Sequence, residues 1–327
     1  MYGIVCHEHG LPEVMQWEEL PNPQPAADEV VIETEAVGVN FVDTMRRSGR
    51  HPAAPAVPFT PGVELVGRVL SAGDNVTRFK AGDRVIGRCQ MHGSYAQQVA
   101  VKQRFTVPCP DSIPAVDAAG LFVNPQTAYH ALVTMGRTEP GDVVLVTAAA
   151  GGVGLAAIQM AKALDATVIA LSGSEDKLAL TREVGADTAI SYRDPDWPAR
   201  VREATGGRGA DLILESVGGS TTTGCVDCWA EGGRMVVYGK ASGETGYIPG
   251  DQLLFGNRAV LGLAVGIVIE DEFLMRSAMD HIIDLYQSDR LKIHAGLTLP
   301  LAEAAKAHRQ LEARQTTGKI VLLPDAG

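Results

Sequence analysis

The first third of the chain carries short runs in which apolar and polar residues alternate. The run at 29–33 reads Glu-Val-Val-Ile-Glu, and clusters of Gly, Pro, Asp and Asn close such runs at 10–12, 21–23, 72–75 and 81–83. Short strands bounded by turn-forming residues are typical of a β-rich domain. The pattern therefore predicts a barrel-like domain that reaches to about residue 115.

The hydrophobic pattern changes after Pro114, where runs of helical period alternate with short apolar runs. Helical periodicity covers 125–135, 153–164 and 174–184. The strand candidates are 143–147, 167–171, 188–191, 212–215, 234–238 and 259–263. Strands that alternate with helices of this length predict βαβ units and a parallel sheet. Six such strands suit a doubly wound dinucleotide-binding fold, so the expected class is α/β.

The segment after about residue 266 shows two more helical patterns and one strand candidate at 319–323. It is too short to bury a core of its own. We therefore expect it to pack back on one of the two preceding domains.

Composition and charge narrow the class of protein. Of 327 residues, 46% are hydrophobic and 20% are charged, which fits a globular chain of two domains. The net charge of −11 repels phosphate groups, so we expect no nucleic-acid partner and no binding to anionic membranes. Five cysteines, an odd number, make no disulfide framework. Without a secretory signal or a long unbroken apolar run, the sequence predicts a cytoplasmic protein.

A glycine-rich turn joins the apolar strand at 143–147 to the helix at 153–164. Aligned to the G-x-G-x-x-G pattern, its positions are Ala149, Gly151 and Gly154. The helix begins at this turn, so its first N–H groups and its dipole favour a pyrophosphate there. We expect the cofactor to contact the turn at Ala150, Gly151, Gly152, Val153 and Gly154. The alternative is a glycine-rich turn with a structural role only.

The tip of the second strand decides which dinucleotide is preferred. An NAD-binding site needs a carboxylate there for the ribose 2′-hydroxyl, but this strand runs into Ser172, Gly173 and Ser174. Hydroxyl groups with Lys177 and Tyr192 nearby would accept a 2′-phosphate, which a carboxylate would repel. The sequence therefore favours NADPH over NADH. Lys177 also fits the alternative of an ordinary solvated lysine on a helix.

Motifs along the whole chain resemble the medium-chain dehydrogenase/reductases, and among them the zinc-free, zeta-crystallin-like quinone oxidoreductases. They are the stretches 4–10, 12–14, 38–43, 47–49, 61–67, 81–85, 93–96, 148–154 and 318–322. The resemblance implies a GroES-like barrel formed by both chain ends around a Rossmann domain. The expected domains are 1–122, completed by 266–327, and a nucleotide-binding domain at 123–265. Such an architecture explains the short C-terminal segment.

The resemblance also allows the zinc sites of related alcohol dehydrogenases to be compared residue by residue. Asn40, Val63 and Val123 stand where those enzymes carry catalytic zinc ligands, and they do not make a tetrahedral nitrogen and sulfur site. The matching stretch of the structural zinc lobe, 88–93, holds one cysteine instead of four. We therefore expect no metal in either place.

Two further clusters contain metal-binding or redox-active residue types. We interpret Cys6-His7-Glu8-His9 as a strand end followed by a turn, because alternation divides its side chains between two faces. Cys225 and Cys228 fall in a helical run, where we expect small buried cysteines, with a redox pair as the alternative.

Without zinc, the expected chemistry is hydride transfer from NADPH to an already activated acceptor, a quinone or an α,β-unsaturated carbonyl. The Asn40 amide would donate a hydrogen bond to the acceptor oxygen, and by resemblance it also touches the nicotinamide ribose. The alternative is a polar residue that caps the next helical turn. His51 stands where many relatives carry a tyrosine, so it is a candidate proton donor or a loop histidine that faces water.

The resemblance implies further contacts with the cofactor and with the acceptor. Cofactor contacts are expected at Thr127, Val217, Tyr238 and Lys319, and the acceptor pocket at Phe41, Arg46 and Tyr129. Two other functions remain open: an enoyl-thioester reductase, and a non-enzymatic NADPH-binding structural or RNA-binding protein. The net charge of −11 argues against RNA binding.

The run 259–265 is apolar on both faces and is expected to form the last strand, at an edge of the sheet. An exposed edge strand must be covered or paired. We predict a homodimer in which this strand pairs with its own copy. The alternative is a monomer whose C-terminal helices cover the edge.

Overall fold

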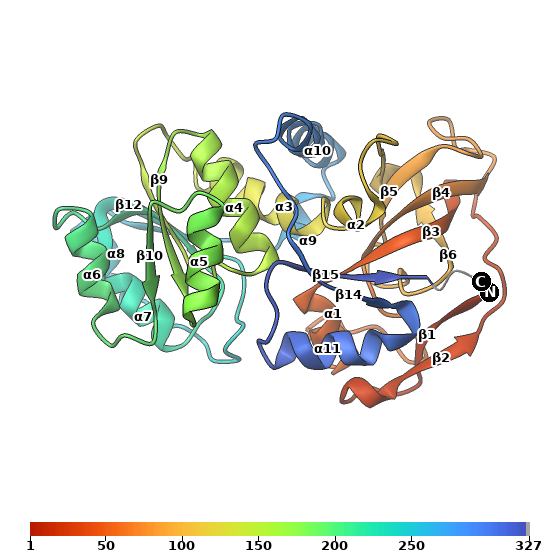
Figure 1. The fold of residues 1–327 in the computed structure, drawn as a ribbon, viewed down its shortest axis with the longest axis horizontal. Helices are drawn as coiled ribbons and strands as arrows, with labels where there is room; N and C mark the ends of the chain where they lie inside the picture. The colour runs from red at the N-terminus through yellow and green to blue at the C-terminus, as the bar shows by residue number, and fades with distance from the viewer. Residues whose placement is uncertain (325–327) are drawn as a thin grey trace. The chain divides into compact units, whose positions relative to one another are not determined.

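The computed structural model describes residues 1–324, which form two compact units (Figure 1). One unit is Met1–Val123 together with the segment from Ile293 onward, and the other is Asn124–Lys292. Among the helices of residues 1–324, none is both long enough and apolar enough to span a membrane.

The first unit is built on strands, as the alternating pattern predicts. Its main sheet has the order β14-β15-β3-β4-β5-β7, and β6 also pairs with β3. These strands are β3 (Glu29–Val39), β4 (Glu64–Ala72), β5 (Arg84–Arg88), β6 (Gln98–Lys102), β7 (Thr106–Pro108), β14 (Ala295–Pro300) and β15 (Lys319–Leu323). A separate antiparallel pair consists of β1 (Tyr2–Cys6) and β2 (Met15–Glu19). The helices of the unit are α1 (Phe41–Arg47), α2 (Ala115–Ala118) and α11 (Ala304–Glu312).

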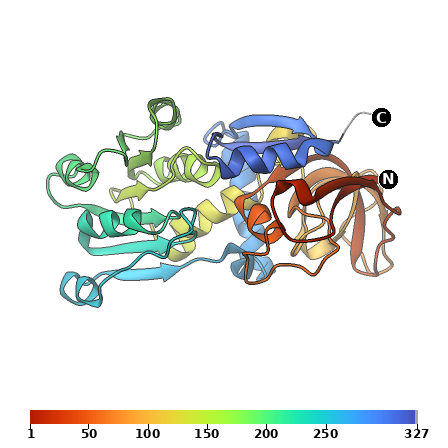
Figure 2. The same cartoon turned by 90° about the horizontal axis from the view of Figure 1, so that it is seen from below.

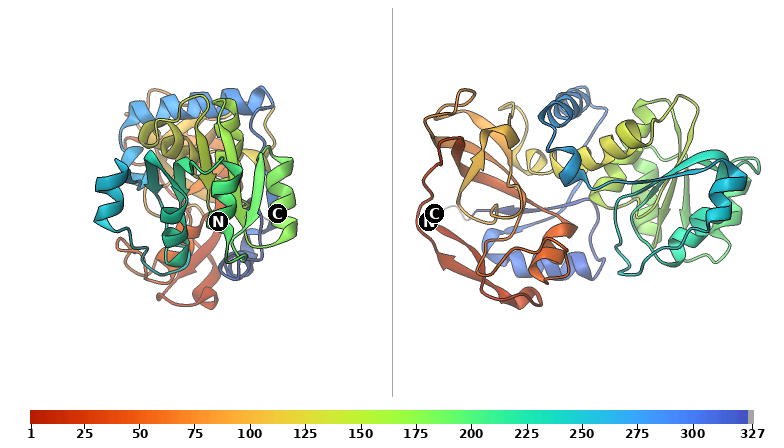
Figure 3. Two further views of the ribbon diagram at one scale, coloured as in Figure 1. Left: turned by 90° about the vertical axis from the view of Figure 1, so that its left-hand side faces the viewer. Right: turned by 180° about the vertical axis from the view of Figure 1, so that it is seen from behind.

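The C-terminal strand completes this first sheet. β15 runs antiparallel to β3, with Ile320 opposite Val39. Figure 3 shows the blue C-terminal strands beside the red and orange N-terminal ones. The expectation that 319–323 forms a strand and packs back on a preceding domain is confirmed.

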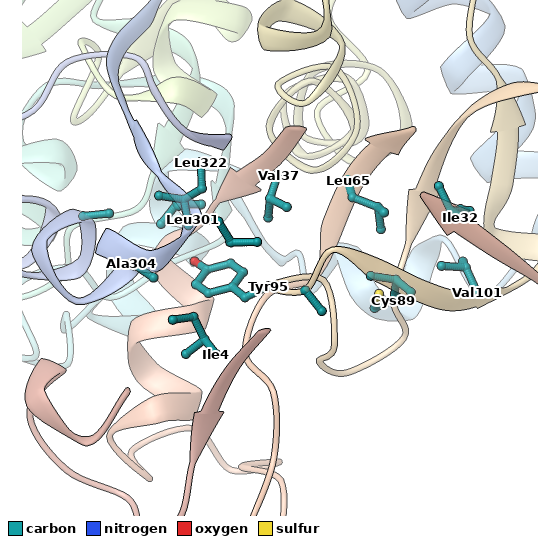
Figure 4. Packing of buried hydrophobic residues seen from close by; sticks show 14 of the residues in the cluster. Ile4, Ile32, Val37, Leu65, Cys89, Tyr95, Val101, Leu301, Ala304 and Leu322 are labelled. Atoms are coloured by element: carbon teal, nitrogen blue, oxygen red, sulfur yellow. The ribbon is translucent and has the colours of Figure 1, made fainter. Parts of the chain in front are cut away.

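The core of the first unit joins both chain ends. Tyr95 is fully buried beside Ile4 from β1 and Leu301 and Ala304 from the C-terminal segment (Figure 4). Burial of apolar side chains from distant parts of the sequence holds the C-terminal segment in place, at about 25 cal/mol for each Å² removed from water.

The second unit contains the predicted parallel sheet. Its order is β10-β9-β8-β11-β12-β13, and every neighbouring pair is parallel. The strands are β8 (Val143–Val146), β9 (Thr167–Ser172), β10 (Thr188–Ser191), β11 (Ala210–Glu215), β12 (Trp229–Val237) and β13 (Ala259–Gly262). This is the doubly wound order, so the predicted α/β class is confirmed. β13 forms one edge of the sheet, in light blue in Figure 2.

Helices connect these strands. α4 and α5 pack on β9, and α7 and α8 pack on β11 and β12. The helices are α3 (Val123–Tyr129), α4 (Gly152–Ala163), α5 (Glu175–Glu183), α6 (Trp197–Ala204), α7 (Ser220–Asp227), α8 (Gly250–Gly256), α9 (Val265–Val268) and α10 (Glu272–Gln287). A π-helical stretch, His130–Met135, continues α3.

The second boundary between the units differs from the expected one. Residues 266–292 belong to the second unit and not to the first, which is called the barrel unit below. The reason is hydrogen bonding across the unit: Gln126 Nε2 donates to the carbonyl oxygen of Met275 at 2.8 Å, and Gln159 exchanges two bonds with the backbone of Lys292. The chain returns to the barrel unit only at Ile293.

The stretch Cys6-His7-Glu8-His9 ends β1 at Cys6 and continues into a bend, as predicted. His7 Nε2 lies 2.8 Å from a carboxylate oxygen of Glu18, and His9 Nε2 lies 3.0 Å from the carbonyl oxygen of Pro55. Cys225 and Cys228 are free and buried, as expected for small cysteines on a helix, and burial raises the pKa of the Cys228 thiol to about 12.

Candidate active site

The turn after β8 has the geometry that the glycine pattern predicts. A Cβ at Gly154 would lie 2.5 Å from the carbonyl oxygen of Ala149, so only glycine lets α4 pack this close to the turn. At Gly151 a Cβ would meet only the Ala148 oxygen, at 3.3 Å. The N-terminal N–H groups of the twelve-residue helix α4 follow directly. This turn is suited to a pyrophosphate.

The tip of β9 carries an unsatisfied polar group. The Ser172 hydroxyl is buried and has no hydrogen-bond partner within the described residues 1–324. A Cβ at Gly173 would lie 2.4 Å from the hydroxyl oxygen of Tyr192, so the phenol ring lies close to this glycine. Lys177 is half-buried in the first turns of α5. A buried hydroxyl group normally has a partner, so its absence at Ser172 fits a site built to hold a ligand such as a 2′-phosphate.

The tip of β11 is organised by a buried carboxylate. Glu215 accepts hydrogen bonds from the backbone N–H groups of Val217, at 2.7 Å, and Gly218, at 3.0 Å, and from the Thr222 hydroxyl at 3.2 Å. Tyr238 donates its backbone N–H to the carbonyl oxygen of Glu215 at 3.0 Å. Glu215 therefore fixes the loop that carries Val217, a predicted cofactor contact.

Helix α3 carries two of the predicted residues. Thr127 is buried, and the ring of Tyr129 lies 5.5 Å from the rings of both His130 and His281. Tyr129 is half-buried.

In the barrel unit, Asn40 lies in a buried charged cluster with Glu64 and Lys319. The Asn40 Nδ2 donates to Glu64 Oε1 at 2.8 Å, and the Lys319 ammonium donates to Asn40 Oδ1 at 2.9 Å. Lys319 also forms an ion pair with Glu64, and the second Glu64 oxygen accepts the Val123 N–H at 2.7 Å. The carboxylate attracts the amide N–H and the ammonium attracts the amide oxygen, so the cluster fixes which way the amide points.

Asp43 connects this cluster to helix α1. Its Oδ2 accepts the Asn40 N–H at 2.8 Å and the Tyr95 hydroxyl at 3.3 Å, and the same hydroxyl lies 3.0 Å from His308 Nε2. Burial raises the pKa of Asp43 to about 7, although the Asn40 N–H and the charge of Arg46 oppose the shift. These contacts hold the backbone on which the Asn40 side chain stands.

The remaining predicted residues of the barrel unit follow along α1 and its next loop. Phe41 is partly exposed and Arg46 is buried. His51 Nδ1 accepts the Ala53 N–H at 3.0 Å, so the ring proton of a neutral His51 is on Nε2. Burial and the charge of Arg46 lower the pKa of His51, which keeps it neutral at pH 7.

The structure differs from the sequence-based prediction at Lys319 and adds two acidic residues to the site. The Lys319 ammonium lies in the protein interior, so its direct contact with the cofactor stays a prediction, and the contact observed is with Asn40. Glu64 and Glu215 were not predicted as site residues. The signal was present, because each is an acid at or beside an apolar run, 63–66 and 212–215.

Comparison with known proteins places these features in a family. Residues 26–111 match the alcohol dehydrogenase GroES-like domain, and residues 152–281 match the zinc-binding dehydrogenase domain. The quinone oxidoreductase of Pseudomonas aeruginosa is 36% identical over 317 residues, which cover 97% of this chain and 97% of that protein. The chain belongs to the medium-chain dehydrogenase/reductase superfamily, among the quinone oxidoreductases. It is an oxidoreductase.

Other medium-chain dehydrogenase/reductases are similar over their whole length. The solved structure of Escherichia coli quinone oxidoreductase in complex with NADPH has a TM-score of 0.93 and 33% identity, covering 99% of this chain and 100% of that one. A 2-haloacrylate reductase from a Burkholderia species is 34% identical over 346 residues, with 99% of both chains covered.

The zinc positions of this medium-chain dehydrogenase/reductase hold residues that do not fit the metal. Asn40 uses its amide for Glu64 and Lys319, and Val63 and Val123 offer no ligand atoms on their side chains. Within residues 1–324, no group of three His, Cys, Asp or Glu side chains is arranged to hold an ion. Zinc requires several nitrogen, sulfur or carboxylate ligands, so these positions do not form a zinc site.

Proposed function

We propose that this protein is an NADPH-dependent reductase that transfers hydride, without zinc, to a quinone or an α,β-unsaturated carbonyl compound. The observation that carries the proposal is the Asn40–Glu64–Lys319 cluster, in which Asn40 holds the position of a catalytic zinc ligand in the related alcohol dehydrogenases. Alcohol oxidation needs a group that activates the hydroxyl, whereas an activated acceptor needs only orientation and a hydrogen bond to its oxygen.

The nucleotide-binding unit supplies the cofactor side of this function. NADPH, when bound, supplies a hydride from C4 of its nicotinamide. The turn at Gly151 and Gly154 would hold the pyrophosphate, and Ser172, Lys177 and Tyr192 would hold the 2′-phosphate. The NADPH complex of the E. coli relative supports this assignment. The unpartnered Ser172 hydroxyl is the strongest support from this chain itself.

Asn40 has one N–H for the acceptor oxygen. Its Nδ2 donates to Glu64 at 2.8 Å, but the second contact, to the carbonyl oxygen of Gly38, is long at 3.4 Å. The weakly held hydrogen would turn to the acceptor oxygen as negative charge develops there. Since Glu64 and Lys319 already fix the amide, little reorganisation is needed.

His51 would serve only acceptors that need a proton on carbon. Its Nε2–H, set by the bond from Ala53, is its available donor. Reduction of a C=C bond adds a hydride to one carbon and a proton to the other, so an enone depends on such a donor more than a quinone does. The names of the relatives include both acceptor types, quinones and a haloacrylate.

We further propose that the protein is a homodimer that pairs through β13. Val260 is 39% exposed on this edge strand, and the neighbouring helix α8 exposes Leu254 and Phe255, the latter at 79%. Apolar side chains beside an unpaired strand edge favour association. Pairing of β13 with its own copy would satisfy the backbone groups of the edge and cover these side chains in one closed contact.

Steady-state turnover tests the proposed function. NADPH oxidation would be followed with 1,4-benzoquinone, 3-buten-2-one and a crotonyl thioester under identical conditions. We expect turnover of the quinone or the enone with kcat/KM above that of the thioester. A clear preference for the thioester would favour an enoyl-thioester reductase. Binding of NADPH with no turnover of any of the three would favour a non-enzymatic role.

A further inference from the structure

Arg46 and Arg47 are adjacent buried arginines with different partners. Arg47, 1% exposed, pairs with Glu312 through two bonds of 2.8 and 3.2 Å. Arg46, 8% exposed, donates through Nη1 to the carbonyl oxygen of Met91 and has the Met91 sulfur 4.0 Å from Nη2. Among residues 1–324, neither its Nε nor that of Arg47 has a hydrogen-bond partner, so the two arginines differ in their counter-ion. Across residues 1–324, no carboxylate forms an ion pair with Arg46.

This difference matters because a buried charge without a counter-ion is unfavourable. Removing a guanidinium from water costs several kcal/mol, and in proteins such groups normally find a carboxylate. A carbonyl oxygen and a thioether compensate Arg46 only in part, and the thioether contact at 4.0 Å is weak. Binding of an anion to the Arg46 guanidinium would therefore be favourable.

The groups around Arg46 increase this tendency. His51 and His92 lie close enough for the charge of Arg46 to lower the pKa of each, together with burial. Both are neutral at pH 7 and add no negative charge. Asp43 is the carboxyl group whose charge raises the pKa of Arg46, although burial lowers that pKa more strongly. Its Oδ2 accepts hydrogen bonds from the Asn40 N–H and the Tyr95 hydroxyl. Within residues 1–324 the Asp43 Oδ1 forms no hydrogen bond, and burial raises the pKa of this carboxyl to about 7, so Asp43 compensates the charge of Arg46 only in part.

Arg46 is also near the proposed acceptor position. Asn40 immediately precedes α1 and Arg46 lies within it, so the two residues are about 9 Å apart along the helix axis at roughly 1.5 Å per residue. Asp43 links the two residues, because its Oδ2 accepts the Asn40 N–H at 2.8 Å and the charge of Arg46 acts on the same carboxyl.

We infer that Arg46, with His51 and His92, binds a carboxylate of the acceptor, so that the substrates are α,β-unsaturated carbonyl compounds that also carry a carboxylate. This inference rests on the proposed function. The carboxylate replaces the Met91 sulfur at the guanidinium and uses the paired N–H groups of arginine. The acceptor oxygen then lies toward Asn40.

Binding of an unreactive ligand pair tests this without turnover. Isothermal titration would compare 4-oxopentanoate with its methyl ester in the presence of NADP⁺. We expect the acid to bind at least tenfold more tightly than the ester. Arg46→Met should remove this preference, and Arg46→Lys should retain part of it. The control Arg50→Met alters an exposed arginine just after α1 and should leave the preference unchanged.

The outcomes separate this inference from the proposed function. Equal affinity of acid and ester, or an unchanged preference in a folded Arg46 variant, overturns the carboxylate site. If Arg46→Met fails to fold, the ratio of the acid and ester affinities in the wild-type protein and in Arg46→Lys still tests the carboxylate site. A strong acid preference without reduction of 4-oxo-2-pentenoate, of 3-buten-2-one or of 1,4-benzoquinone would retain the carboxylate site and refute the reductase. Reduction of neutral enones with no acid preference would support the reductase and overturn the carboxylate site.

Discussion

The ammonium of Lys319 lies 2.9 Å from the side-chain oxygen of Asn40, although 279 positions separate the two residues. The pairing of β15 with β3 brings them together, because Ile320 stands opposite Val39, the residue before Asn40. The end of the chain therefore positions a residue near its beginning. Glu64 completes the arrangement by binding both the ammonium and the amide.

The first prediction concerns Asn40. Asn40→Ala removes the proposed donor and should lower kcat for an enone by about 10² to 10³, the effect of one oxyanion donor. A quinone, which needs less polarisation, should lose less, and the Kd of NADPH should change less than kcat. Stopped-flow turnover and fluorescence titration measure these quantities, with thermal unfolding as the check on folding. Unchanged kcat for both acceptors would show that Asn40 is structural only.

The second prediction concerns the charge pair that holds Asn40. Lys319→Met leaves Glu64 buried without its cation and should lower the free energy of unfolding in urea by about 3–5 kcal/mol. Adding Glu64→Gln removes the uncompensated charge and should restore most of that loss. The double variant should still turn over slowly, because the amide is no longer fixed. A single Lys319→Met variant as stable as wild type would contradict the pairing.

The sequence predicts the elements that depend on local pattern. β8, the glycine turn and α4 were expected within a residue or two, since a buried strand, a tight turn and a helix start each leave a local signal. The strand at Lys319–Leu323 was expected with the same bounds. The parallel pairing of the six strands follows from their alternation with helices.

Contacts between distant positions leave no such signal. The sequence predicts Lys319 at the cofactor, whereas its observed partner Glu64 lies 255 positions away. Glu64 belongs to the family motif at 61–67, but nothing in that motif indicates an ion pair with Lys319. The return of the chain at Ile293 depends on bonds from Gln126 and Gln159, two buried polar side chains whose distant partners leave no local pattern. The helical patterns after 266 predicted helices but not the unit on which they pack.

The third prediction concerns the cofactor. NADPH should bind at least tenfold more tightly than NADH, a difference of about 1.4 kcal/mol. Lys177→Ala should remove most of this difference and leave the Kd of NADH nearly unchanged. Ser172→Ala should also weaken NADPH, yet should not lower protein stability, because the hydroxyl has no protein partner to lose.

Arg182→Ala is the matched control for Lys177, since Arg182 is an exposed cation on the same helix and pairs with Glu175. It should leave the selectivity intact. Equal affinities of the wild-type protein for NADPH and NADH would refute the 2′-phosphate assignment.

The fourth prediction concerns assembly. Light scattering at micromolar concentration should give twice the chain mass of 34.5 kDa. Leu261→Lys places a charge on the edge strand β13 and should yield monomers, because a buried lysine in the interface is strongly unfavourable. The control Leu11→Lys changes an exposed leucine outside the nucleotide-binding unit and should leave the mass doubled. A wild-type mass of one chain would exclude the dimer.

The most direct test of zinc-free hydride transfer is isotopic. The protein would be treated with a strong chelator and then given NADPH deuterated at C4 together with 3-buten-2-one. The account predicts unchanged turnover after chelation and one deuterium on the β-carbon of the product from one of the two C4 positions. Loss of activity that added zinc restores, or a product without deuterium from either C4 position, would contradict it.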